Sequence, residues 1–159
     1  MYNYTVKALF LDFDGVLNSH RYLYSNRRPA NMEFKGNEHL MLDPEAVARV
    51  NRIIEATGAK VVISSSWRHA WPLERLREIL AARAFVGDVI DITPSGSSFG
   101  VRRGDEIAQW LDEHPGVTKF VAIDDDADDS LIMKHHLVKT MFAYGLQDHH
   151  VEDAISRLL

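Results

Sequence analysis

The sequence contains no cysteine, which excludes disulfide bonds, thiolate catalysis and zinc sites built on cysteine. It also has no apolar run of about 18 residues, the length that marks a membrane-spanning helix. Its first residues lack the charged and then apolar pattern of a secretory signal. Together these absences predict a cytoplasmic protein without a membrane partner.

Basic residues are in the minority, since 18 Lys and Arg against 23 Asp and Glu give a formal net charge of −5. A general nucleic-acid-binding protein usually has a basic excess, so the balance argues against one without excluding a local basic patch. The length of 159 residues suits one domain with a buried core. We expect residues 1–159 to form a single domain, whose oligomeric state the sequence does not specify.

An apolar run that ends in carboxylates is the most informative stretch of the chain. Residues 5–11 are continuous, β-branched and aromatic, typical of a buried parallel strand, and Asp12, Asp14 and Gly15 follow. Ligands of open α/β sheets bind at the carboxyl ends of strands, so both aspartates should lie in a crevice. Two such charges repel by about 4 kcal/mol at 4 Å and an effective dielectric constant near 20, so a cation should lie between them. Mg²⁺ is the cation expected at a site with only oxygen ligands. An ordinary turn is the alternative, because Asp and Gly are common there.

Strand and helix patterns alternate along the rest of the chain. Asp43 and Pro44 are typical of a helix start, and Gly58 of its end. Further strands are expected at residues 59–63, 89–92, 117–123 and 137–140. Helices are expected within 72–83, 104–115 and 130–135 and from about residue 149. This alternation predicts an α/β fold with a doubly wound parallel sheet, whose strands end at one common edge.

Serines follow the second expected strand, beginning at Ser64. A serine hydroxyl and the backbone N–H groups after it can donate to phosphate oxygens. Ser65 and Arg68, close by in the sequence, would extend the phosphate or substrate site. The alternative is that these serines only cap the next helix. We expect Trp67 to pack between helix and sheet rather than to stack on a base.

Five carboxylates within six residues follow the fourth expected strand, beginning with Asp124 and Asp125. An acidic helix start would explain the later members of this run. It does not explain the first two, which adjoin the buried strand end. A basic residue ahead of the preceding helix, Arg102 or Arg103, could reach the same edge. We favour Arg103, because it directly precedes the glycine that opens the helix.

In this order the motifs resemble those of the haloacid dehalogenase (HAD) superfamily. Its phosphatases carry a DxD motif, a Ser or Thr, a Lys or Arg and an acidic pair. The matching residues here are Asp12-Phe13-Asp14-Gly15, Ser64, Arg103 and Asp124-Asp125. Three further segments are similar to the small HAD domains of RNA-repair proteins: Ser65-Ser66-Trp67-Arg68, Gly104-Asp105-Glu106-Ile107 and the Gly145-Leu146 turn. The resemblance implies a HAD-type Rossmann-like core with a minimal cap.

The resemblance also implies a Mg²⁺-dependent phosphomonoester hydrolase that forms an aspartyl-phosphate. Asp12 would be the nucleophile, and Asp14 would serve as general acid and then general base. Ser64 and Arg103 would bind the phosphoryl oxygens. The metal ligands would come from Asp12, Asp14 through its backbone carbonyl, Asp124 and Asp125.

Residues 18–41 form the only insertion between the first two motifs, and we expect a small cap or flap. It is interpreted as a long irregular loop that offers positive charge through Arg21, Arg27, Arg28, Lys35 and His39. Because no separate cap domain fits, the substrate could be a nucleotide, a nucleic-acid end or a small phosphate ester. One alternative is a phosphate-binding module of the same fold without turnover. Another is a phosphoryl-accepting receiver domain, which would need an aspartate where Ser64 stands.

Overall fold

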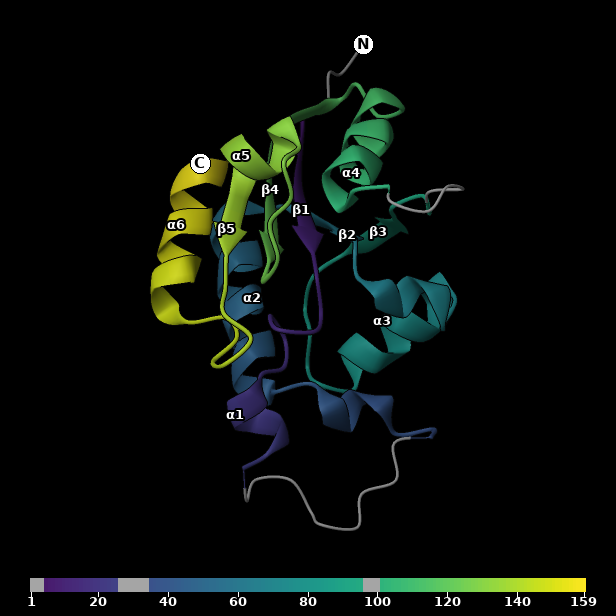
Figure 1. Cartoon of the computed structure of the whole chain (residues 1–159), viewed down its shortest axis with the longest axis vertical. Coiled ribbons are helices and arrows are strands. Elements are labelled where there is room, and N and C mark those ends of the chain that lie inside the picture. The colour runs from purple at the N-terminus through teal and green to yellow at the C-terminus, as the bar shows by residue number, and fades with distance from the viewer. Residues whose placement is uncertain (1–4, 26–34, 96–100) are drawn as a thin grey trace.

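The computed structural model describes residues 5–25, 35–95 and 101–159 (Figure 1). One parallel sheet has the strand order β3-β2-β1-β4-β5. Its strands are β1 (Val6–Leu11), β2 (Lys60–Ile63), β3 (Val89–Ile92), β4 (Val117–Asp124) and β5 (Leu137–Lys139). The helices are α1 (His20–Leu23), α2 (Pro44–Thr57), α3 (Leu73–Ala81), α4 (Arg103–Asp112), α5 (Leu131–His136) and α6 (Asp148–Leu158). Two 3-10 helices are η1 (Glu38–Met41) and η2 (Ser66–His69). The predicted doubly wound α/β fold is confirmed.

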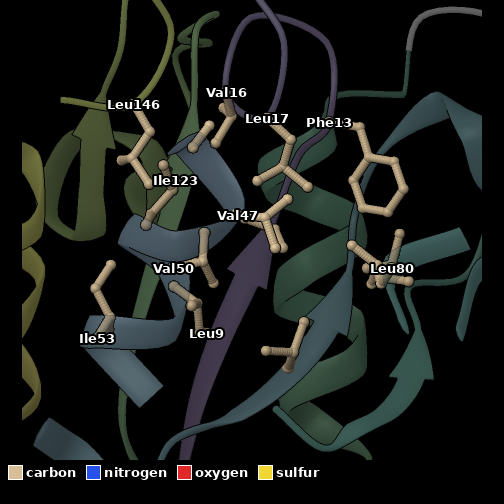
Figure 2. Packing of buried hydrophobic residues seen from close by; sticks show 14 of the residues in the cluster. Leu9, Phe13, Val16, Leu17, Val47, Val50, Ile53, Leu80, Ile123 and Leu146 are labelled. Carbon is tan, nitrogen blue, oxygen red and sulfur yellow. The ribbon is translucent and has the colours of Figure 1, made fainter. Parts of the chain in front are cut away.

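The side chains of β1 alternate between two apolar layers, as expected for a strand buried on both faces. Leu9 and Leu11 belong to the layer that includes buried residues of α2, α3 and α6. Figure 2 shows this layer, with Leu9 near Val50 of α2. Ala8 and Phe10 belong to the second layer, with buried residues of α4 and α5. Burial of each large side chain stabilises the fold by about 1.5–3 kcal/mol.

Helix α2 begins and ends where the sequence signals place it. Asp43 caps its N-terminus, accepting a hydrogen bond from the Glu45 backbone N–H at 2.9 Å. Gly58 ends it with a left-handed φ of 70°.

The expectation of an irregular loop over residues 18–41 was wrong in part, because α1 and η1 lie within it. Arg27 and Arg28 of that insertion lie outside the described residues.

Backbone hydrogen bonds hold the residues that follow β1, β2 and β4 side by side. The Asp12 N–H donates to the Ile123 carbonyl at 3.1 Å, and the Ser64 N–H donates to the Leu11 carbonyl at 3.1 Å. The arrows of β1, β4 and β5 all point toward the end of the molecule where α1 lies (Figure 1). The motifs after these strands therefore meet at one edge of the sheet. In the described part of the chain, no helix combines the length and apolarity needed to cross a bilayer.

Candidate active site

The site is centred on Asp12, which is 3% exposed at the end of the central strand. A tight turn follows, in which the Phe13 carbonyl accepts from the N–H groups of Val16 and Leu17. Gly15 has a φ of +81°, a conformation that glycine adopts without strain. A Cβ at Gly15 would lie 2.1 Å from Asp125 Oδ2, so glycine is what lets that carboxylate approach the turn.

Asp12, Asp124 and Asp125 form the acidic cluster of the site. Each offers a carboxylate oxygen, and the three oxygens lie within 4.8 Å of one another. Clustered carboxylate oxygens are the donors that Mg²⁺ binds, so the residues fit such a metal. The Asp14 carboxylate is not a member of this cluster. A metal ligand from Asp14 would have to be its backbone carbonyl, as the resemblance implied.

Burial and mutual repulsion disfavour full ionisation of the acidic cluster. Burial, followed by the charge of Asp124, raises the pKa of Asp12 from 3.8 to about 8, against an opposing effect of Arg103. Burial and the charge of Asp124 also raise the pKa of Asp125. A bound cation would relieve this repulsion and favour the ionised carboxylates.

Arg103 supplies the positive charge of the site. Its Nη1 lies 2.5 Å from Asp124 Oδ2 and 3.2 Å from Asp12 Oδ2. Arg102 instead pairs with Asp105 one turn further along α4, at 2.9 Å, and both of these side chains are exposed. The structure therefore brings Arg103 into the acidic cluster, the arginine that the sequence favoured.

Close packing at the start of α4 fixes the position of the backbone from which the Arg103 side chain extends. A Cβ at Gly104 would lie 1.7 Å from Ser130 Oγ, so α4 and the N-cap of α5 could not approach this closely with a side chain there. The Gly104 N–H also donates to Asp128 Oδ2 at 3.0 Å. Asp128 thus has a structural role, as expected for the later members of the acidic run.

The second carboxylate of the DxD motif, Asp14, is exposed and faces a different set of partners. Its Oδ1 accepts from Asn18 Nδ2 at 2.9 Å and from Trp67 Nε1 at 3.1 Å. Neither contact could be predicted from the sequence. A tryptophan among apolar residues is expected to be buried in the core, and nothing in the nearby sequence indicates where its indole N–H points.

The three residues expected to bind phosphate or substrate after β2 are all buried and have different partners: Ser64, Ser65 and Arg68. Ser64 follows β2 directly, and its backbone bond to Leu11 places it beside Asp12. Ser65 is fully buried, and its hydroxyl accepts from the backbone N–H of Trp67 at 3.2 Å, so Ser65 caps η2 as the alternative interpretation expected.

The Arg68 guanidinium is directed into the protein. It donates to three backbone carbonyls, those of Thr93, Ser64 and Ser65, and pairs with Glu106 at 2.8 Å. The Ser65 and Arg68 side chains thus make contacts within the protein, while Arg68 also lines the pocket that contains Arg103 and Asp124, so their binding of substrate stays a prediction. Arg68 ties the loop after β2 to β3 and α4.

Two pockets lie near the carboxyl edge of the sheet. One, of about 320 Å³, is lined by both Arg103 and Asp124 and is large enough for a phosphate ester. The other, of about 580 Å³, is lined by Arg21, Arg49 and Tyr144 among others and includes no member of the acidic cluster. The pocket of about 320 Å³ is therefore the one that adjoins the acidic cluster.

The site combines one aspartate after the central strand of a parallel sheet with an acidic pair after the neighbouring strand, an arrangement expected of a HAD-type α/β domain. In line with this, residues 8–151 match the family described as "HAD domain in Swiss Army Knife RNA repair proteins". The match covers well over half of the chain, which therefore belongs to this family. Searches of curated proteins and of solved structures gave no match.

Proposed function

We propose that the protein is a Mg²⁺-dependent phosphomonoester hydrolase that works through an aspartyl-phosphate on Asp12. The main support for this proposal is the environment of Asp12, which is buried, belongs to the acidic cluster and lies 3.2 Å from Arg103. A second carboxylate, Asp14, lies two residues further on and is exposed. A nucleophile beside a cation, with an accessible acid nearby, is the set of groups that phosphoryl transfer needs.

In the first step, a carboxylate oxygen of Asp12 attacks the phosphorus of the ester. The bond from phosphorus to the ester oxygen breaks, and that oxygen takes a proton from Asp14 as it leaves. Arg103 stabilises the negative charge on the phosphoryl oxygens, and the Ser64 hydroxyl donates to one of them. Mg²⁺, held by Asp12, Asp124, Asp125 and the Asp14 carbonyl, would offset repulsion between the nucleophile and the phosphate.

In the second step, water hydrolyses the aspartyl-phosphate. Asp14, now ionised, takes a proton from the water as its oxygen attacks phosphorus. The bond between phosphorus and the Asp12 oxygen breaks, and inorganic phosphate leaves. Asp12 is then a carboxylate again and Asp14 is protonated, as at the start of the cycle.

We further propose a nucleotide or a nucleic-acid end as the substrate. The family description names RNA repair, and the loop after β5 exposes Phe142 and Tyr144. The Thr140 hydroxyl donates to the Gly15 carbonyl at 2.6 Å, so this loop is joined to the turn that carries Asp14. Exposed aromatic rings stack on bases of any sequence, at about 1–3 kcal/mol per base.

Hydrolysis of p-nitrophenyl phosphate with and without Mg²⁺ tests the proposed activity. We expect turnover that requires Mg²⁺, is abolished in Asp12→Asn and persists in Asp126→Asn. The latter makes the same change of charge in the same acidic run, at an exposed residue outside the acidic cluster. Phosphate binding without turnover would favour the non-catalytic module instead.

A further inference from the structure

The exposed carboxylate of Asp14 is held by two side-chain donors on the same oxygen. Trp67 Nε1 lies 3.1 Å from Asp14 Oδ1, and Asn18 Nδ2 lies 2.9 Å from that atom. The tryptophan comes from η2, after the second strand, whereas the asparagine closes the turn that follows the first strand. Two separate parts of the chain thus fix one atom of Asp14.

Both donors are buried and packed, although the carboxylate that they hold is exposed. Trp67 is 6% exposed, and its ring packs against Phe13 and Trp71 at centroid distances of 5.1 and 5.0 Å. Asn18 is 1% exposed, and its Oδ1 accepts from the Gly15 N–H at 3.0 Å. This last bond leaves the Asn18 amide nitrogen to face Asp14.

These contacts decide where a proton can reside on Asp14. An indole N–H only donates, and so does the amide nitrogen of asparagine. A proton on Oδ1 would therefore oppose two donors, so the protonated carboxyl group carries its proton on Oδ2. General acid catalysis needs that proton at a fixed place within hydrogen-bond reach of the leaving oxygen.

We propose that Trp67 and Asn18 are positioning residues that hold Asp14 by Oδ1, so that Oδ2 exchanges protons with the leaving group and with water. The inference rests on the proposed function, because it gives Asp14 the role of acid and base. It assigns to Trp67 a role beyond packing, carried by its indole N–H.

The contact itself can be tested without measuring activity. The chain has three tryptophans, and their indole N–H groups give separate signals in a ¹⁵N-correlated NMR spectrum. We expect Asp14→Ala to shift the Trp67 indole signal and to speed its exchange with water. Trp110 is an internal reference, because its Nε1 donates to Asp91 Oδ2 at 2.8 Å, so its signal should stay in place. An unmoved Trp67 signal would overturn the inference.

The kinetic test compares Trp67→Phe, which keeps an aromatic ring and removes the N–H, with Trp110→Phe, which makes the same change at the indole that donates to Asp91. An aryl ester such as p-nitrophenyl phosphate needs little protonation of its leaving group, whereas an alkyl ester such as a nucleoside 3′-phosphate needs it fully. Positioned acids contribute about 10²- to 10⁴-fold, so loss of one of two donors should lower kcat/KM for the alkyl ester by about tenfold. The aryl ester should lose much less, and Trp110→Phe should leave the ratio of the two kcat/KM values unchanged.

Other outcomes are equally informative. An equal loss for both esters in Trp67→Phe would make the tryptophan merely structural, and a gain would mean that the contact restrains Asp14 away from its working position. Either result overturns the inference. If the wild-type protein hydrolyses neither ester, the proposed function fails, and the Trp67 indole signal still decides whether Asp14 is held.

Discussion

Asp12 should make the metal-free protein less stable as the pH rises. Its pKa is raised in the folded state from 3.8 to about 8, so the folded protein retains a proton that the unfolded chain has released. The contribution of Asp12 to stability is therefore fully present below about pH 4 and is lost as the pH rises through about 8. Each pKa unit corresponds to about 1.4 kcal/mol, so we expect a loss on the order of 2–5 kcal/mol across the window.

Thermal unfolding in the presence of EDTA, followed by circular dichroism between pH 5.5 and 8.5, measures this effect. A change of 1 kcal/mol shifts Tm by about 2–4 °C in a domain of this size, so the wild type should lose about 5–15 °C. Asp12→Asn cannot titrate and should show a flatter profile, whereas Asp126→Asn should follow the wild type. Mg²⁺ at a hundredfold excess over Kd should restore about 2.7 kcal/mol at pH 8.

Three results would refute this reasoning. The first is a wild-type Tm that is constant or rises through the window, and the second is an Asp12→Asn profile parallel to that of the wild type. The third is a Tm at pH 8 that millimolar Mg²⁺ leaves unchanged, which would argue against a metal site in the acidic cluster.

Three further predictions concern residues around the site. Arg103→Ala should lower kcat/KM by about 10²- to 10³-fold because it contacts the acidic cluster, and an equal or larger loss for exposed Arg102→Ala would contradict that assignment. Arg68→Met should destabilise the fold by about 3–5 kcal/mol in denaturant unfolding, because it breaks a buried ion pair, and an unchanged midpoint would contradict this. The double change of Phe142 and Tyr144 to alanine should raise KM for a 3′-phosphorylated oligonucleotide but not for p-nitrophenyl phosphate, and equal effects on both would count against base stacking.

The fold could be predicted because its signals are local. The apolar runs of the strands, and signals such as Asp43 and Gly58 at the ends of α2, act over a few residues and agree with one another. The convergence of Asp12 and Asp124 also followed from the sequence, because parallel strands end at one edge. Strand boundaries consequently differ from the expected ones by only a residue or so.

The partners that long polar side chains contact could not be predicted in the same way. Nothing in the sequence around Arg68 indicates its partner Glu106, which lies 38 residues further along the chain. The Trp67 contact with Asp14 spans 53 residues, and packing directs the indole N–H. Such contacts depend on how β2 and α4 are placed against the central strand, which only the tertiary structure specifies. The roles of Ser64 and Arg103 in turnover stay predictions, as do the cap function of the insertion and the cytoplasmic location.

Trapping the covalent intermediate is the most direct test of the account. Asp14→Asn keeps the nucleophile, and it removes the base that activates water for the second step. Incubated with p-nitrophenyl phosphate and Mg²⁺ and quenched rapidly in acid, this variant should carry one phosphoryl group on Asp12, located by peptide mass spectrometry. The same variant with Asp12→Asn added should carry none. Labelling at Ser64 or at a histidine, or undiminished turnover by Asp12→Asn alone, would contradict the aspartyl-phosphate mechanism.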